Sequence, residues 1–330
     1  MIDPNRMIST LTSRPRPVRF GIVIPAFQAS STLPSTLDAV ADQTLPPTSV
    51  VVVVDGPDPD LERIIVEHRL DCDVMVLPEN TGAPCTPRNV GAASLRARPD
   101  IDAIWFLDND DIPAPEFLAI MDETLGSHPE AMFACSSFRN WNDASPREVA
   151  ETRSAARTVS TELEVDWYLA NSGEVLPSFS VFRIAAVDLL ERNGGLFRPE
   201  LPSNQDYDVF VRLFHLVEAR RVEWRGGDYR IHAASISADR ARSWSCRVRA
   251  DLMLADWFAS RSQENIAREF RKRSRSAARR AARERWHAGA RRSAARELLR
   301  QAVVGPDFKA VAVLARLACG LERPSIRGGG

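Results

Sequence analysis

Three carboxylates within four residues form the most chemically suggestive pattern, Asp108-Asn109-Asp110-Asp111, directly after the apolar run 101–107. Carboxylates packed this closely repel one another unless a cation lies among them, and their hard oxygens suit Mg²⁺ or Mn²⁺. Such a metal ion would bridge a diphosphate and stabilise it as it leaves. The alternative is a solvated acidic turn that caps the following helix. The position directly after a buried strand favours the metal site.

Two further side chains could bind the same diphosphate-containing ligand. Asp55 ends a run of five valines, 50–54, where its carboxylate could accept a hydrogen bond from a base or a ribose hydroxyl. The alternative for Asp55 is ordinary turn chemistry in an Asp-Gly-Pro sequence. Arg88 lies in the first turn of an expected helix and could pair with a phosphate or a uracil carbonyl. The alternative for Arg88 is a surface arginine.

Asp206 is the candidate for proton transfer, because it opens the expected helix 205–217. The positive end of a helix dipole favours the charged carboxylate, which is the form that a general base needs. Helix capping alone is the alternative. His232 follows Asp228-Tyr229-Arg230-Ile231, and a single histidine is more often structural than a ligand.

Alternating strands and helices must position these residues. Apolar runs predict strands, and helical spacing of apolar residues predicts the helices between them. This alternation indicates an α/β domain with a mostly parallel sheet, in which ligands bind beyond the carboxyl ends of the strands. Pro25, Asp55 and Asp108 should therefore converge on one crevice. The expected strands are 18–25, 50–54, 74–77 and 101–107, and the expected helices are 32–43, 61–70, 87–98 and 115–125.

The second half of the chain is less regular. Residues 140–164 are polar and irregular and indicate a loop or an excursion over the site. Everything beyond Trp244 reads as helical, with a break at Gly305-Pro306. Other expected elements are strands at 131–138, 177–181 and 221–232 and a helix at 184–192.

Composition indicates an ordinary globular protein: 44% of the 330 residues are hydrophobic and the formal net charge is −1. The five cysteines form no CxxC pair and predict reduced thiols in a cytoplasmic protein. Residues 1–17 are expected to form a flexible segment without a signal peptide, and no apolar run is long enough to span a bilayer. The motifs GxGxxG and GxxxxGK[ST] are absent, which argues against a dinucleotide fold and a P-loop.

The stretch 261–300 is strongly basic, with fourteen Arg or Lys, four Glu and no Asp. The first interpretation is a solvated helical hairpin whose arginines pair with the acidic catalytic domain. The second is peripheral contact with an anionic membrane, at the inner face. Nucleic acid is a distant third and is not expected as a partner, because Phe270 and Trp286 are too few for a stacking platform.

Six motifs taken in order resemble the inverting family 2 glycosyltransferases with a GT-A fold. The resemblance covers roughly residues 18–240 and leaves 241–330 as an Arg/Ala-rich helical region. Gln205 stands where the family usually has Glu, and Val54 replaces the first acid of the second-strand turn. The motifs are Val23-Ile24-Pro25-Ala26-Phe27, Val54-Asp55-Gly56-Pro57, Asn80-Thr81-Gly82 with Pro87-Arg88-Asn89, Leu107 to Asp111, Gln205 to Asp208, and Tyr229 to His232.

The resemblance implies a single-displacement transfer from a nucleotide sugar, UDP-linked by preference and dTDP- or GDP-linked otherwise. The implied acceptor is a hydroxyl of a glycan, a lipid-linked molecule or another compound. Two alternatives stay open: a catalytically silent sugar-nucleotide-binding module and a nucleotidyltransferase. The implied roles are Asp206 as base, Asp110 with His232 for Mn²⁺ or Mg²⁺, Asp55 with Arg88 nearby for the nucleotide base, Asp108 and Asp111 for ribose or metal, and Pro25 and Phe27 as donor contacts.

Overall fold

The computed structural model describes residues 16–143, 145, 158–160, 163–232, 239–304 and 307–321. Most of the predicted loop 140–164, the predicted break at Gly305-Pro306 and nearly all of segment 1–17 lie outside these residues. Among the described residues, no helix combines the length and the apolar character needed to cross a bilayer.

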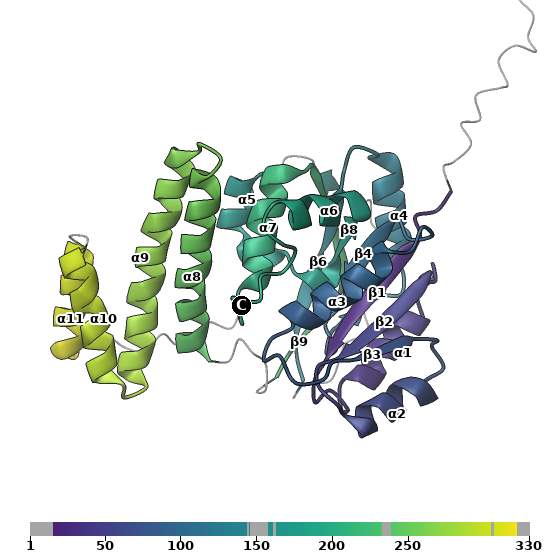
Figure 1. The fold of residues 1–330 in the computed structure, drawn as a ribbon, viewed down its shortest axis with the longest axis horizontal. Coiled ribbons are helices and arrows are strands. Elements are labelled where there is room, and N and C mark those ends of the chain that lie inside the picture. The colour runs from purple at the N-terminus through teal and green to yellow at the C-terminus, as the bar shows by residue number, and fades with distance from the viewer. Residues whose placement is uncertain are drawn as a thin grey trace, which may run out of the picture.

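The first half of the chain alternates strands and helices as the sequence predicts (Figure 1). Strands β3, β2, β1 and β4 lie side by side in that order and are all parallel. The valine run is the interior of β2, where β-branched side chains fit the pleated, buried surface. The elements are β1 (Phe20–Ala26), α1 (Leu33–Ala41), β2 (Ser49–Val54), α2 (Pro59–Glu67), β3 (Asp73–Val76), α3 (Cys85–Arg96), β4 (Ala103–Phe106) and α4 (Phe117–Ser127).

The second half extends this into a nine-stranded mixed sheet, in the order β3-β2-β1-β4-β8-β6-β9-β5 with β7 paired to β9. Strand β8 is antiparallel to both β4 and β6, while β6 and β9 are parallel. Sequence analysis missed β5, and residues 177–179 of the expected strand 177–181 form a 3-10 turn before β8. These elements are β5 (Ile112–Pro113), β6 (Phe133–Asn142), β7 (Val159–Ser160), α5 (Val165–Ala170), β8 (Ser180–Arg183), α6 (Ile184–Arg192), α7 (Gln205–Leu216) and β9 (Ala219–Ile231).

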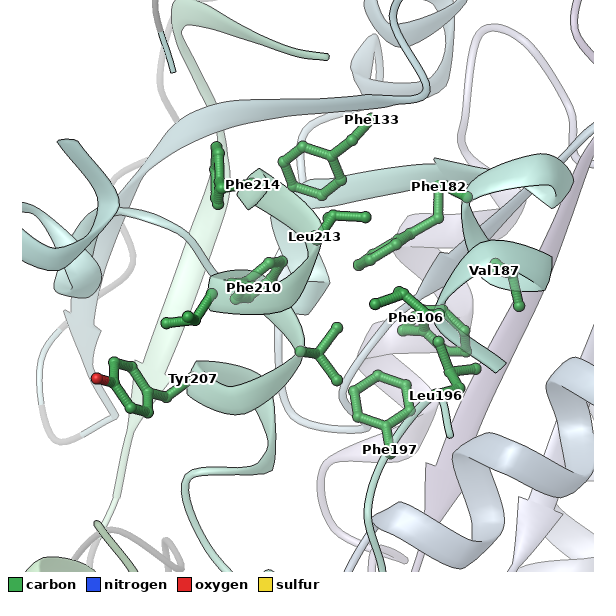
Figure 2. Packing of buried hydrophobic residues seen from close by; sticks show 14 of the residues in the cluster. Phe106, Phe133, Phe182, Val187, Leu196, Phe197, Tyr207, Phe210, Leu213 and Phe214 are labelled. Carbon is green, nitrogen blue, oxygen red and sulfur yellow. The ribbon is translucent and has the colours of Figure 1, made fainter. Parts of the chain in front are cut away.

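Successive residues of the strands pack alternately into two separate hydrophobic cores, one on each face of the sheet. Val51 and Val53 point into the core shared with α3, α6 and α7, whereas Val50 and Val52 point into the core shared with α1 and α4. Figure 2 shows the aromatic centre of the first core, where the rings of Phe106 and Phe182 meet edge to face at 5.3 Å. The fold is therefore an α/β sandwich, which confirms the expected class.

A helical extension follows the sheet, and its helices lie progressively farther from the sheet (Figure 1). Its first helix, α8 (Arg240–Ala259), contributes Leu254 and Phe258 to the same core as the sheet. The hydrophobic core thus crosses the boundary expected at residue 241. Helices α9 (Glu264–His287), α10 (Arg291–Val304) and α11 (Phe308–Ala318) share a smaller core of their own.

The arginines of the extension pair largely within it. Arg240 meets Glu284 at 3.4 Å, and Arg279 pairs with Asp307 across α9 and the start of α11. These ion pairs join helices of the extension to one another. The first interpretation of the basic stretch had expected pairs with the acidic α/β domain, whereas these two pairs lie within the extension.

Candidate functional site

Three neighbouring strands deliver the predicted residues to one edge of the sheet. Strands β2, β1 and β4 are adjacent, and Asp55, Pro25 and Asp108 lie at or just beyond their carboxyl ends. Asn109 Nδ2 donates a hydrogen bond of 2.8 Å to the Pro25 carbonyl, which ties the acidic cluster to β1. The predicted convergence of these strand ends is confirmed. Phe27, one residue beyond β1, leaves its ring 49% exposed at the same edge.

Asp55 is buried and organises the loop that follows β3. One carboxylate oxygen accepts a 2.9 Å bond from the Thr81 amide, and the other accepts a 3.1 Å bond from the Thr81 hydroxyl. Gly56 makes this close approach feasible: its φ is +97°, and a Cβ there would lie 2.9 Å from the Asn80 nitrogen. Asp55 therefore shapes the loop 80–82, a role that the sequence did not reveal.

Arg88 and Asp108 form an ion pair in which the guanidinium is buried and the Asp108 side chain is 31% exposed. The guanidinium, on a side chain only 2% exposed, donates from Nη2 to Asp108 Oδ1 and lies 5.1 Å from the ring centroid of Phe197. Burial disfavours the charge, but the Asp108 carboxylate outweighs it, and the pKa of Arg88 is raised. Its Nε and Nη1 atoms have no hydrogen-bond partner within the described part of the chain. Buried donors without a partner are rare, so these two nitrogens are candidates for a further hydrogen bond, such as one to a ligand oxygen.

Asp110 and His232 face each other, with His232 Nε2 2.9 Å from Asp110 Oδ2. Both side chains are about a quarter exposed, so the pair is open to solvent on one side. Burial, followed by the negative charge of Asp108, raises the pKa of Asp110. The two predicted metal ligands are thus brought together, although they lie 122 positions apart in the chain.

Asp111 turns into the protein. Its side chain has no solvent exposure, and Oδ1 accepts a 3.0 Å bond from the Arg230 amide of β9. Its carbonyl accepts a bond of 3.1 Å from the Thr36 hydroxyl. Burial, with the charges of Asp110 and Asp108, raises the pKa of Asp111 well above its usual range. This geometry fits an anchor between α1 and β9. Asp111 Oδ2 has no hydrogen-bond partner among the described residues, and the expected contact of Asp111 with ribose or metal stays a prediction.

The donor set fits a divalent metal that is shared with a substrate. Among the described residues, no group of three or more His, Cys, Asp or Glu side chains could hold an ion alone. Asp110 and His232 supply an oxygen and a nitrogen. Mg²⁺ is usually bound through one or two carboxylates together with water and substrate phosphates. A pair of protein ligands at this edge is compatible with that arrangement.

Asp206 is the second residue of α7, which begins at Gln205 after Asn204, whose backbone is left-handed with φ 61°. Burial raises the pKa of Asp206, while the Tyr207 amide and then the nearby Arg88 charge oppose that rise. The expectation that the helix dipole would favour the charged form is wrong in its net effect, because desolvation is the larger influence. The charges of Arg88 and Asp108 both act on this pKa, which indicates that Asp206 lies within electrostatic range of their ion pair.

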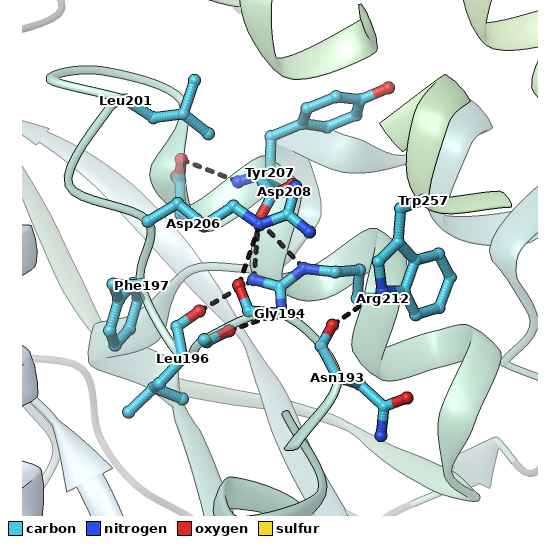
Figure 3. Close-up of polar contacts among 12 residues, drawn as sticks. Asn193, Gly194, Leu196, Phe197, Leu201, Asp206, Tyr207, Asp208, Arg212 and Trp257 are labelled. Carbon is cyan, nitrogen blue, oxygen red and sulfur yellow. Dashed lines mark hydrogen bonds and ion pairs between the residues drawn. The ribbon is translucent and has the colours of Figure 1, made fainter. Parts of the chain in front are cut away.

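Sequence analysis missed a buried network behind Asp206, shown in Figure 3. Asp208 and Arg212 are fully buried and pair at 2.6 Å, one helical turn apart. Arg212 also donates to the Gly195 and Leu196 carbonyls at 2.6 and 2.8 Å. The Asp-x-x-x-Arg spacing was the available signal, since residues four apart share a helix face. The network fixes the start of α7 against the loop 193–198.

The same loop is bound to α3 by Asn89. Its Nδ2 donates 2.7 Å to the Phe197 carbonyl, and its Oδ1 accepts 3.0 Å from the Phe197 amide. This reciprocal pair holds the Phe197 ring near Arg88. Asn89 is thus a positioning residue that sequence analysis quoted in a motif without giving it a role.

Helix α8 completes the support of the site. The Tyr207 hydroxyl donates 2.9 Å to the buried Asp251 carboxylate, and the Arg247 guanidinium lies 3.2 Å from the Tyr207 ring centroid. The indole of Trp257 donates 2.7 Å to the Asn193 carbonyl (Figure 3). The extension therefore contacts the residue next to Asp206 and also the loop 193–198.

Comparison with known proteins agrees with this geometry. A family model described as "Glycosyl transferase family 2" matches residues 21–189, just over half of the chain. A poly(ribitol-phosphate) β-N-acetylglucosaminyltransferase, TarS of Staphylococcus aureus, is 25% identical over 193 residues, which is 57% of this chain and 31% of the relative. An uncharacterised glycosyltransferase of Haemophilus influenzae is 27% identical over 113 residues, covering 34% of this chain and 36% of that protein. The chain thus spans about a third of the length of the curated relatives it matches.

Solved structures share the fold over nearly the whole chain. The 1–349 fragment of S. aureus TarS superposes with a TM-score of 0.60 at 18% identity, covering 92% of both chains. The same fragment in complex with UDP-GlcNAc gives a TM-score of 0.62 at 17% identity, again covering 92% of both. The chain belongs to glycosyl transferase family 2 and has the GT-A fold. The family resemblance is thereby confirmed.

Proposed function

We propose that this protein transfers a sugar from a nucleotide-sugar donor to an acceptor hydroxyl with inversion at the anomeric carbon. The observation that carries the proposal is the buried Arg88 guanidinium. It pairs with Asp108 on the proposed donor side, and its charge also acts on Asp206, which supports a site that combines both residues. Its two unpartnered nitrogens are suited to the oxygens of a phosphate or a uracil.

In the proposed reaction, Asp206 takes the proton of the acceptor hydroxyl. The acceptor oxygen attacks the anomeric carbon from the face opposite the nucleotide, and the bond from that carbon to the diphosphate oxygen breaks. The electron pair of that bond leaves with the nucleoside diphosphate. Asp110 and His232 would hold a divalent ion, which stabilises charge on the departing diphosphate when bound. Burial makes Asp206 a stronger base than an exposed aspartate, because its pKa is raised.

Donor-binding roles divide between the strand ends. Asp55 and the loop it shapes would meet the nucleotide base, with Asp108 at the ribose and Phe27 at the exposed rim. Asp111, anchored by Arg230 and Thr36, would contact the ribose or the metal through its unpartnered Oδ2. UDP is the favoured nucleotide, because the similar TarS fragment was solved in complex with UDP and with UDP-GlcNAc. We place the reaction in the cytoplasm, on an acceptor that is a glycan, a lipid-linked molecule or another hydroxyl compound.

The two alternatives fare differently. A nucleotidyltransferase should carry a glycine-rich basic loop after the first strand, and residues 27–33 contain neither glycine nor a basic residue. The family match likewise favours a glycosyltransferase. Gln205, which stands where the family usually has Glu, leaves a catalytically silent binding module as the remaining alternative. Detectable hydrolysis of a sugar nucleotide would distinguish an enzyme from such a module.

Calorimetric titration with UDP, in EDTA and in Mn²⁺, tests the site. UDP is expected to bind more tightly with Mn²⁺, and His232→Ala should remove the gain from Mn²⁺ while leaving binding in EDTA unchanged. His68→Ala is the matched control, since His68 lies at the end of α2 next to Asp38. Absent or metal-independent UDP binding by the wild type would overturn the site assignment. A panel of sugar nucleotides assayed for metal-dependent hydrolysis would then identify the donor and establish catalysis.

A further inference from the structure

A groove between α9 and α11 is a concave, strongly basic surface. It consists of two adjoining hollows of about 630 and 420 Å³. Eight different Lys or Arg side chains line them, against the two acids Glu269 and Asp307. We call this surface the basic groove, and its cations include Lys272, Arg275, Arg279, Lys309 and Arg316.

The positive charge of the basic groove is not neutralised locally. Glu269 is bound to Lys272 at 3.1 Å, and Asp307 is bound to Arg279. Within the described part of the chain, Arg275, Lys309 and Arg316 make no ion pair. Arg275 lines the larger hollow, Arg316 lines the smaller one, and Lys309 lines both. The groove therefore presents excess cationic donors, and arginine in particular matches the geometry of phosphate.

Apolar side chains border the same groove on α11. Val313 and Leu317 are buried on the inner face, where they pack against α9 and α10. On the other side Phe308 is 83% exposed, and Val311 is 50% exposed. Phe308 also lines the larger hollow. A helix that combines an exposed apolar face with flanking cations is typical of a helix lying in a membrane interface.

We propose that the basic groove and the exposed face of α11 form a docking surface for anionic lipid headgroups. Phe308 and Val311 would enter the boundary between headgroups and acyl chains, while Lys309, Arg316 and Arg275 contact phosphates. Exposed Phe308 favours a lipid surface over a dissolved polyanion, which offers no apolar phase for the ring. The sequence had placed membrane contact at residues 261–300, whereas the structure shifts it toward α11. The proposal does not depend on the sugar transfer.

Co-sedimentation of the full chain with vesicles tests the proposal. We expect binding to phosphatidylcholine vesicles that contain 30% phosphatidylglycerol, as a chosen composition, and loss of binding to pure phosphatidylcholine and at high salt. Lys309→Gln with Arg316→Gln should weaken partitioning roughly fivefold for each charge removed. Phe308→Ser should weaken it about tenfold, even though it removes no charge.

Arg292→Gln with Arg296→Gln is the matched control, because it removes the same charge from exposed positions on α10 that do not line the groove. The control should bind vesicles like the wild type. Equal loss in the control, or no effect of Phe308→Ser, would overturn the proposal. Polyphosphate binding that is as tight as vesicle binding and insensitive to Phe308→Ser would assign the groove to a dissolved polyanion instead. Retained UDP binding and circular dichroism establish that each variant is folded.

Discussion

The two sides of the candidate site are built by different means. Asp55, Asp108 and Asp110 follow the ends of adjacent parallel strands, so backbone pairing alone brings them to one edge. Asp206 lies on a helix, and buried side chains from distant segments set its position. The donor side is therefore a property of sheet topology, whereas the base side is a property of side-chain packing.

This difference has an energetic consequence. A strand end keeps its place through many backbone hydrogen bonds, each of which contributes a modest amount. The start of α7 depends on the pair Asp208 and Arg212, neither of which is exposed to solvent. Removing one partner of such a pair leaves an uncompensated buried charge. Substitutions behind Asp206 should therefore unfold the protein more readily than substitutions at the strand ends.

Asp206→Asn should have the largest effect on function. Loss of the base is expected to lower turnover by about 10²–10⁴-fold, while the affinity for UDP changes little. The measurement is initial-rate transfer with the identified donor, combined with UDP titration. Asp256→Asn, at an exposed position of α8, serves as the control.

The pH profile sharpens this test. Because burial raises the pKa of Asp206 and the base acts without its proton, kcat/KM should rise with pH through a value above the ordinary aspartate pKa of about 3.9. Turnover that survives in Asp206→Asn with the same acid limb would show that another group is the base. The base would then not lie at the start of α7, and the division into a donor side at the strand ends and a base side at Asp206 would be wrong.

Arg212→Met should have the largest effect on stability. It leaves the Asp208 carboxylate buried with Arg198 as its remaining ion partner, and we expect the free energy of unfolding to fall by about 3–5 kcal/mol. Urea unfolding measures the change. The paired substitution Asp208→Leu with Arg212→Met should cost less than the sum of the single substitutions, because it removes both charges. A fall below 1 kcal/mol in the single variant would mean that the base side is not held by this network.

Tyr207→Phe should have a smaller effect than Asp206→Asn has on turnover or Arg212→Met has on stability. It removes a hydrogen bond to buried Asp251, and we expect a loss of about 1–3 kcal/mol in unfolding free energy. Tyr168→Phe is the matched control, since the Tyr168 hydroxyl makes no hydrogen bond within the part of the chain that the structure describes. Equal losses in the two variants would show that α8 does not support the base side through this bond.

The contrast between the two sides also explains what the sequence could predict. Strand runs and the residues after them are local patterns, so the convergence of Pro25, Asp55 and Asp108 followed from the order of elements. The inward turn of Asp111 could not be predicted, because it depends on pairing with Arg230 of β9, 119 positions away. Strand β5 was missed because two residues carry no periodic signal.

The other features that could not be predicted from the sequence depend on burial by residues far away in the chain. The helix dipole favours a charged carboxylate at an exposed helix start. Burial has the larger influence on the pKa of Asp206, and the sequence does not show which segments bury it. Asn89 was visible in a motif, yet its partner Phe197 lies 108 positions away. The roles of residues 80–82 and 193–198 likewise became clear only from their contacts.

Strand β9 places a constraint on how this sequence can diverge. It runs 13 residues from Ala219 to Ile231, pairs with Asp111 near its end, and is followed at once by His232 beside Asp110. Side chains alternate between faces along a strand, so a single inserted or deleted residue would reverse every face beyond it. Homologous proteins can therefore vary the composition of this strand, whereas changes in its length would separate histidine from aspartate.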